Sequence, residues 1–226
     1  MKIWHISDTH GYHDLLKVEK NENIDMVIFS GDSSNNRASS INENEVINFI
    51  EWYKKLPYEY KIFVAGNHDS SIEEKLIKKD YFNKNRIFYL ENESITLNHI
   101  NIFGSPYTPT FNNWCFMKDR NKMNKIWELI PYNTNIVISH GPPKGILDLT
   151  YNRENELEFC GCSALMKKML NLQPELCLFG HIHNNKSIIN AGITKLSEYK
   201  TIFSNGSVLT DGKFGKLSSN GNILEL

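Results

Sequence analysis

Five short apolar segments of the chain each end in a loop that carries side chains of metal-binding types. The segments span residues 2–7, 25–30, 60–65, 135–139 and 175–179. Runs of four to six apolar residues bounded by glycine or proline are typical of strands buried on both faces. Because the loops at the carboxyl ends of the strands in an α/β fold converge on one crevice, we expect these five loops to form a single site.

The loops offer carboxylate, imidazole and amide groups and no thiolate. The candidate ligands are Asp8, His10, Asp32, Asn67, His68, His140, His181 and His183. Carboxylate oxygen together with imidazole nitrogen suits Mn²⁺, Fe²⁺ or Zn²⁺. A carboxylate shared between two ions is typical of two-metal centres, in which ions about 3.5–4 Å apart clamp the oxygens of a phosphate ester.

The segments between the strands predict helices and additional strands. Amphipathic spacing predicts helices at residues 42–56, 72–79, 118–130 and 163–170. Residues 86–103 and 201–226 alternate more and predict strands, with Asp211-Gly212 and Asn220-Gly221 as hairpin signals. The chain therefore reads as one α/β domain that contains a mixed sheet.

The composition argues against several classes of function. The 226 residues carry a formal net charge of −1, and a nucleic-acid or membrane-surface protein would need a basic stripe. No run approaches the ~18 apolar residues of a membrane span, and the first residues lack a signal-peptide layout. Four cysteines are too few for a disulfide scaffold. We expect reduced thiols and a cytoplasmic location, in the host cell if the chain is viral.

Taken together, the loop motifs resemble those of the calcineurin-like metallophosphoesterase family. The family pattern is D-x-H, then G-D, G-N-H-D/E, a lone H and G-H-x-H. All five blocks stand in this order here, as Asp8-Thr9-His10, Gly31-Asp32, Gly66-Asn67-His68-Asp69, His140 and Gly180-His181-Ile182-His183. Residues 56–61, 103–109, 139–143 and 161–162 are further similar to the vertebrate metallophosphoesterase-domain-containing proteins, a subgroup placed near the class III cyclic-nucleotide phosphodiesterases. The resemblance implies a four-layer α/β/β/α sandwich of two mixed β-sheets flanked by helices.

The resemblance also implies a role for each motif residue. One metal ion would take Asp8, His10, Asp32 and His183, and the other would take Asp32, Asn67, His140 and His181. A hydroxide between the two ions would attack phosphorus in line. His68 would stabilise the transition state or protonate the leaving group, and Asp69 would position its loop. Asp69 also has a simpler interpretation, as the cap of a helix that starts near Ile72.

Two positions distinguish this chain within the resemblance. Vertebrate members can lack the first histidine of the last motif, whereas this chain keeps it as His181, so we expect a complete second metal site. Many phosphomonoesterases of the family place an aspartate three residues beyond the bridging aspartate, where this chain has Asn35. An amide stabilises an imidazolium less well than a carboxylate does, which favours diesters over monoesters as substrates.

Substrate contacts are expected from polar and aromatic residues near the motifs. We assign Asn35, Arg37, Asn113 and Trp114 to substrate binding. Trp114 would stack on a nucleobase or fill its loop as a structural plug, and Arg37 would reach a phosphate. We assign no role to the histidines outside the motifs, His5, His13 and His99.

The sequence therefore predicts a two-metal phosphodiesterase acting on small phosphodiesters, above all 2′,3′- or 3′,5′-cyclic nucleotides, with Mn²⁺ preferred over Fe²⁺ or Zn²⁺. A phosphomonoesterase is the nearest alternative, followed by a nucleotide-binding module without turnover. A nuclease is disfavoured because the net charge of −1 leaves little to hold a polyanion. We expect neither nucleic acid nor membrane as a partner, and the oligomeric state is left open.

Overall fold

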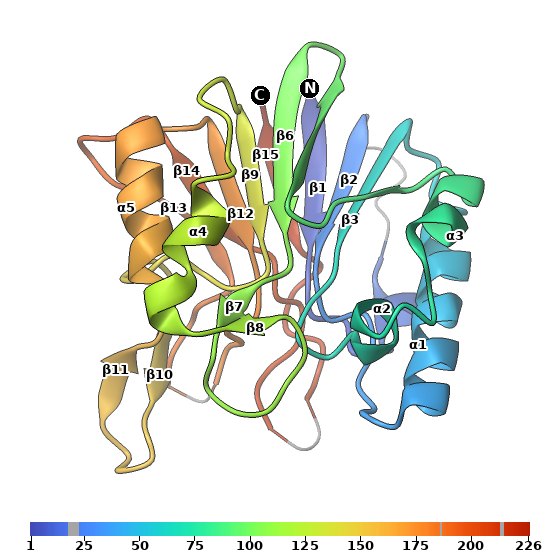
Figure 1. Ribbon diagram of the computed structural model, residues 1–226, viewed down its shortest axis with the longest axis horizontal. Coiled ribbons are helices and arrows are strands. Elements are labelled where there is room, and N and C mark those ends of the chain that lie inside the picture. The colour runs from blue at the N-terminus through green and yellow to red at the C-terminus, as the bar shows by residue number, and fades with distance from the viewer. Residues whose placement is uncertain (18–22, 186, 213–214) are drawn as a thin grey trace.

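The computed structural model describes residues 1–17, 23–185, 187–212 and 215–226, and in these residues two large sheets lie face to face between two groups of helices (Figure 1). The first sheet has the strand order β15 (Asn222–Glu225), β1 (Lys2–Ile6), β2 (Met26–Ser30), β3 (Tyr60–Val64) and β4 (Phe88–Tyr89). The second has the order β13 (Gly192–Lys195), β14 (Ile202–Asn205), β12 (Leu176–Phe179), β9 (Ile136–Ser139), β6 (Ile100–Ser105) and β5 (Glu93–Leu97). The predicted four-layer sandwich is confirmed.

The helices cover the outer faces of the two sheets. The first sheet is covered by α1 (Ser39–Tyr53), α2 (Ser70–Glu73) and α3 (Lys79–Lys84), and the second by α4 (Asn124–Trp127) and α5 (Ser163–Leu172) (Figure 1). Two 3₁₀ turns, η1 (His13–Leu15) and η2 (Arg120–Lys122), and two small ribbons complete the described elements. The ribbons are β7 (Thr108–Pro109) with β8 (Met117–Lys118) and β10 (Leu149–Tyr151) with β11 (Leu157–Phe159).

Alternation along the central strands divides the core into three layers. In β2, Val27 and Phe29 pack in the cluster beneath α1, whereas Met26 and Ile28 pack between the two sheets. Since both faces are covered, the strand reads as a continuous apolar run. The neighbours β1, β2 and β3 are parallel, as are β6, β9, β12 and β14. Parallel pairing brings the carboxyl ends of β1, β2, β3, β9 and β12 to one edge of the sandwich (Figure 1).

Three sequence-based expectations about the elements were wrong. Residues 72–79 do not form one helix, because α2 ends at Glu73 and the backbone turns at Lys75, whose φ is 61°. Residues 118–130 form η2 and the four-residue α4 rather than one long helix. Asn220-Gly221 does not close a hairpin, because the strand after it, β15, pairs with β1 at the other end of the chain.

In the part of the chain that the structure describes, no helix has the length and apolar character needed to cross a membrane. The longest of these helices, α1, instead packs one apolar face on the first sheet through Val46, Phe49 and Ile50.

Phe49 tests how much of the stability comes from the α1 layer. Its fully buried ring lies 4.3 Å from that of Phe29 and 5.2 Å from that of Tyr53, measured between ring centroids. We expect Phe49→Ala to lower the free energy of unfolding by about 3–5 kcal/mol, because truncation of a buried aromatic leaves a cavity. Urea denaturation measures the change, and Ile41→Ala on the exposed side of the same helix is the control. Equal midpoints for the two variants would contradict this packing.

Candidate metal centre

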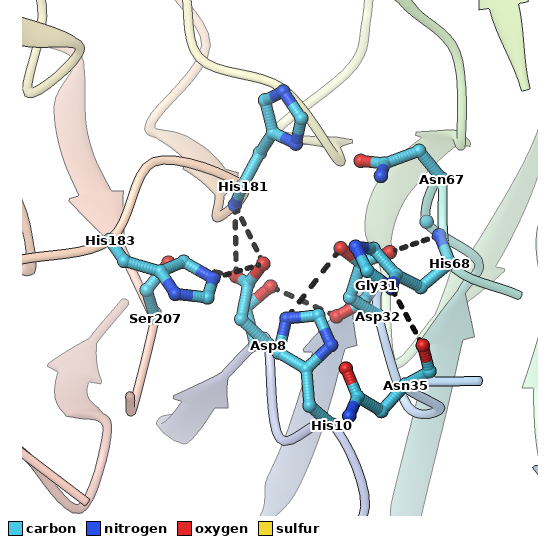
Figure 2. A network of polar contacts seen from close by, with 12 residues as sticks. Asp8, His10, Gly31, Asp32, Asn35, Asn67, His68, His181, His183 and Ser207 are labelled. Carbon is cyan, nitrogen blue, oxygen red and sulfur yellow. Dashed lines mark hydrogen bonds and ion pairs between the residues drawn. The ribbon is translucent and has the colours of Figure 1, made fainter. Parts of the chain in front are cut away.

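The predicted ligands meet at the common edge where the five strands end. Asp8 and His10 follow β1, Asp32 follows β2, Asn67 follows β3, His140 follows β9, and His181 and His183 follow β12. An isolated bridge between Ser7 and Ser207 ties the two sheets together at this edge. In Figure 2 the side chains of Asp8, His10, Asp32 and His183 point toward one another. The structure thus brings together all seven residues that the sequence assigned to metal.

The backbone at these ligands is turned by an unusual conformation. Asp8, His10, Asp32 and His181 have φ values of 56°, 42°, 62° and 72°. Non-glycine residues rarely adopt positive φ, and when they do they cluster at functional sites where the surroundings hold them. Gly31, with φ of 112°, also needs its lack of a side chain, because a Cβ would lie 2.3 Å from Nδ1 of His140.

The ligand atoms gather into groups whose members lie within 4.8 Å of one another. One group is Asp8, His10 and His183, and another is Asp32, His140 and His181. Nε2 of His183 lies 3.2 Å from Oδ1 of Asp8, and Nε2 of His140 lies 3.3 Å from Oδ2 of Asp32. Asp32 also lies beside the first group, with its Oδ2 3.8 Å from Nε2 of His10. The carboxylate of Asp32 therefore stands between the two groups, as a bridging ligand would.

Hydrogen bonds on the far side of two histidines leave the atoms that face Asp32 free to ligate. Nδ1 of His10 donates to the carbonyl of Ser34 at 2.9 Å, and Nδ1 of His140 donates to the carbonyl of Ser30 at 2.9 Å. A carbonyl oxygen only accepts, so Nδ1 carries a proton in both rings, and Nε2 is the ring atom that can face a metal ion. Metal-binding histidines are commonly oriented in this way.

The electrostatics of the site favour ionised carboxylates. Burial alone would raise the pKa of Asp8, but the hydrogen bond and charge of His183 outweigh it, so the pKa is lowered. The pKa of Asp32 shifts in the same way. Burial raises it, but the charges of His140 and His68 outweigh burial and hold the pKa well below its ordinary value. Burial lowers the pKa of His181 to about 3, which keeps that ring neutral. Burial also lowers the pKa of His140, but the charge of Asp32 outweighs it and raises that pKa to about 9. Two buried anions among imidazoles are a donor set for divalent cations.

Asp69 lies behind the centre and organises two of its loops. Its carboxylate accepts backbone hydrogen bonds from Gly66 at 2.8 Å, Asp32 at 3.1 Å, Ser33 at 3.0 Å and Ser34 at 3.2 Å. The hydroxyls of the two serines also donate to it. Although Asp69 stands at the N-cap position of α2, its side chain makes no capping hydrogen bond. The carboxylate thus fixes the loop that carries Asp32 to the loop that carries Asn67.

His68 lies beside the ligands, and its ring forms a third such group with His10 and Asp32. Its backbone N–H donates to Oδ1 of Asp32 at 2.7 Å, and its ring lies 4.5 Å from that of His10. Nδ1 of His68 lies 3.3 Å from the backbone carbonyl of Asn35 (Figure 2). Asn35 therefore contacts the imidazole through its backbone and not through its side-chain amide.

The residues assigned to substrate binding divide between the cavity and the loops around it. A cavity of about 530 Å³ opens above the metal ligands and is lined by Trp114, Phe111 and Tyr151, among others. Arg37, Asn113 and Asn35 are not among its lining residues. The guanidinium of Arg37 instead lies over the ring of Trp114 and donates to the carbonyl of Asn113. That these three residues touch substrate stays a prediction.

Several supporting residues were not predicted from the sequence. The hydroxyl of Ser207 donates to Oδ2 of Asp8 at 2.8 Å. Buried His5 joins the two sheets beneath the site, with its ring nitrogens 2.9 Å from Oγ of Ser30 and 2.8 Å from Oγ of Ser204. Asn42 of α1 donates to the carbonyl of His68 at 2.7 Å. Ser207 follows the parallel strand β14, so the strand-end rule that found the ligands also points to it.

The fold and the ligand arrangement define a class, the metal-dependent phosphoesterases with a two-ion centre. Residues 1–185 match the family described as calcineurin-like phosphoesterase. The chain belongs to this family, whose members hold a dinuclear metal centre.

Curated relatives support the assignment. Metallophosphoesterase domain-containing protein 1 of Homo sapiens is 32% identical over 213 residues, which are 84% of this chain and 62% of the relative. A Caenorhabditis elegans protein of the UPF0046 group is 30% identical over 86% of this chain and 67% of its own length. The chain thus spans about 62% of the length of the human relative.

Solved structures share the fold at low sequence identity. The protein TT1561 of Thermus thermophilus aligns with a TM-score of 0.59 and 13% identity over 90% of this chain and 88% of that one. The phosphopantetheinyl hydrolase of Mycobacterium tuberculosis aligns with a TM-score of 0.57 and 14% identity over 92% and 89% of the two chains. At these identities the likeness concerns the fold alone.

Asp32 provides the sharpest test of the ligand arrangement. We expect Asp32→Asn to weaken metal binding beyond the roughly 10–100-fold loss that follows removal of a supporting residue, because the shared carboxylate becomes a neutral amide. Calorimetric titration with Mn²⁺ measures affinity and stoichiometry. The exposed Asp119, paired with Lys122, gives the control Asp119→Asn. Unchanged Mn²⁺ stoichiometry in Asp32→Asn would contradict the bridging position.

Asp69→Asn tests the clamp behind the centre. An amide in place of the carboxylate presents an NH₂ group to backbone N–H donors and leaves buried donors without partners. We expect the free energy of unfolding to fall by about 2–3 kcal/mol, whereas Asp80→Asn on the exposed start of α3 should change it little. Urea denaturation measures both. A stability equal to that of the wild type would show that the clamp is not needed.

Proposed function

We propose that the chain is a two-metal phosphodiesterase that hydrolyses small phosphodiesters, with cyclic nucleotides as the leading class. The observation that carries the proposal is that five of the seven ligand candidates line one cavity, while the other two, Asp8 and His140, are buried in contact with them. One ion would be held by Asp8, His10, Asp32 and His183, and the other by Asp32, Asn67, His140 and His181. When bound, the ions supply Lewis acidity toward the phosphoryl oxygens and a water of lowered pKa for in-line attack on phosphorus.

The residues of the chain supply position and proton transfer around that chemistry. Asp69 and Ser207 hold Asp32 and Asp8 in place. His68, at the cavity wall beside His10, is placed to donate a hydrogen bond to the leaving oxygen of the ester, as a general acid does. Its Nδ1 faces the neutral carbonyl of Asn35 where a phosphomonoesterase-type site would offer a carboxylate. This supports the diester over the monoester.

The cavity walls support a substrate with an aromatic base. Phe111 and Tyr151 line the cavity and expose 44% and 42% of their surfaces, so their rings are accessible to a stacking partner. Glu158 and Asp211 also line the cavity, as do Arg120 and Arg153, so its wall is of mixed charge and offers no basic stripe for a long polyanion. A small nucleotide with one phosphodiester fits these walls better than a nucleic acid does.

Turnover of bis-p-nitrophenyl phosphate and p-nitrophenyl phosphate with added Mn²⁺ tests the reaction class. We expect the diester to be cleaved well above the monoester, and Asp32→Ala to abolish both rates. A dominant monoester rate would make the chain a phosphomonoesterase. Tight nucleotide binding without turnover in a Mn²⁺-loaded sample would make it a binding module.

Phe111→Ala and Tyr151→Ala test the substrate class. Since a base stacked on an aromatic ring is worth about 1–3 kcal/mol, we expect each substitution to raise KM for a cyclic nucleotide about 5–150-fold. KM for bis-p-nitrophenyl phosphate should rise less. Tyr132, which is 94% exposed and outside the cavity lining, gives the control Tyr132→Ala. An unchanged KM for every cyclic mononucleotide would remove the base from the proposed substrate.

A further inference from the structure

Three loops meet beside the metal ligands through a stack of three side chains, of which only His68 belongs to a family motif. Arg37 comes from the loop after β2, His68 from the loop after β3, and Trp114 from the segment between β7 and β8. The ring of Trp114 lies 4.3 Å from the imidazole of His68, with 34° between the two planes. The guanidinium carbon of Arg37 lies 3.5 Å from the centroid of the Trp114 ring. The indole thus lies between the imidazole of His68 and the guanidinium of Arg37 and packs against both.

The imidazole of His68 is held more loosely by its other contacts than a ligand histidine is. The hydrogen bond of its Nδ1 with the carbonyl of Asn35 is long, at 3.3 Å, and its contact with His10 is edge to face. The ring of His140, by contrast, is buried and held at both nitrogens, 2.9 Å from the carbonyl of Ser30 and 2.9 Å from Oδ1 of Asn67. A group that donates to a leaving oxygen must be held within a fraction of an ångström of its productive place. The broad contact with the indole can provide that restraint.

Trp114 is itself fixed by Arg37. A guanidinium over an indole face is attracted by the electrons of the ring, and the same group donates to the carbonyl of Asn113, the residue before Trp114. Arg37 therefore holds both the ring and the backbone of this segment. Cys115, the next residue, donates its backbone N–H to the carbonyl of Asn67 at 3.3 Å. The segment is thus joined to the His68 loop both through the indole and through the backbone beside it.

We infer that Trp114 is a positioning residue that holds the imidazole of His68 at the phosphoryl site, and that Arg37 holds Trp114. This inference rests on the proposed phosphodiesterase function, and it assigns to Trp114 and Arg37 a role other than direct contact with the nucleobase or the phosphate. In many phosphomonoesterases of the family an aspartate at the position of Asn35 would orient this histidine. Here the contacts of Trp114 and Arg37 orient His68 instead.

A matched pair of diesters separates positioning from substrate binding. Methyl p-nitrophenyl phosphate and methyl phenyl phosphate lack a base and differ in leaving group, and the phenolate, as the poorer leaving group, depends more on a proton donor. We expect Trp114→Ala to lower kcat about tenfold for the phenyl ester, a part of the roughly 10²–10⁴-fold that a general acid supplies. The loss should be smaller for the nitrophenyl ester, and KM should change little for both.

Three further variants complete the test. Trp114→Phe keeps a ring against His68 and should restore most of the lost kcat. Arg37→Gln should lower kcat in the same direction and by less. In a His68→Asn background, Trp114→Ala should cause no additional loss, because the group that it positions is gone. Equal losses in the two backgrounds, or a KM rise confined to nucleotide substrates, would overturn the inference and make Trp114 a base platform.

A measurement without substrate or metal keeps the two proposals distinguishable. Because indole emission responds to groups packed on the ring, His68→Asn should shift the fluorescence of the protein, and the shift should vanish in a Trp114→Phe background. A shift that persists without Trp114, or no shift in either background, would overturn the contact. If the wild type cleaves neither ester, the proposed function fails, and the fluorescence result still decides whether Trp114 holds His68.

Discussion

The site depends on placing the charge of Asp32 where almost no water reaches it. Asp32 is 2% exposed and Asp8 is fully buried, and isolated carboxylates in such surroundings are costly unless they are paired or hold a metal. Oδ1 of Asp32 accepts the backbone N–H of His68, while Oδ2 faces His140 and His10. The loops after β1, β2, β3 and β9 are thereby arranged around one anion. Divalent cations held at this place would compensate the buried negative charge of Asp8 and Asp32.

The surrounding architecture holds these loops in strained conformations. The parallel strands of each sheet end at the same edge of the sandwich. Hydrogen bonds of Asp69, Ser207 and His5 then fix the loops from behind. Positive φ at Asp8 and Asp32 is unfavourable by itself, so it persists because these hydrogen bonds and the layered core determine it. The ligand side chains are thereby already gathered at one place in the structure.

The central strands and the ligand positions were predictable because both depend on short-range signals. Buried parallel strands read as apolar runs, and each run is followed at once by its ligand. The shorter helices were less predictable, since the positive φ at Lys75 ends a segment whose spacing alone looks helical. The pairing of β15 with β1 joins the two ends of the chain, and the local Asn220-Gly221 signal gives no hint of it.

The cavity walls were the hardest part to predict from sequence. Tyr151 lies on the β10–β11 ribbon and reaches the cavity only through the tertiary fold. The residue type of Trp114 predicts substrate binding, and Trp114 does line the cavity, but its contacts with His68 and Arg37 have no signal in the sequence. Residues that act through long-range side-chain contacts carry no motif, so a single sequence gives their chemistry without their partners.

The central claim is that the five strand-end loops form one centre for two ions that share Asp32. Anomalous X-ray diffraction from crystals grown with Mn²⁺ tests it most directly. We predict two anomalous peaks about 3.5–4 Å apart, one beside Asp8, His10 and His183 and the other beside Asn67, His140 and His181, with the carboxylate of Asp32 between them. A single peak, or peaks away from these residues at saturating Mn²⁺, would contradict it.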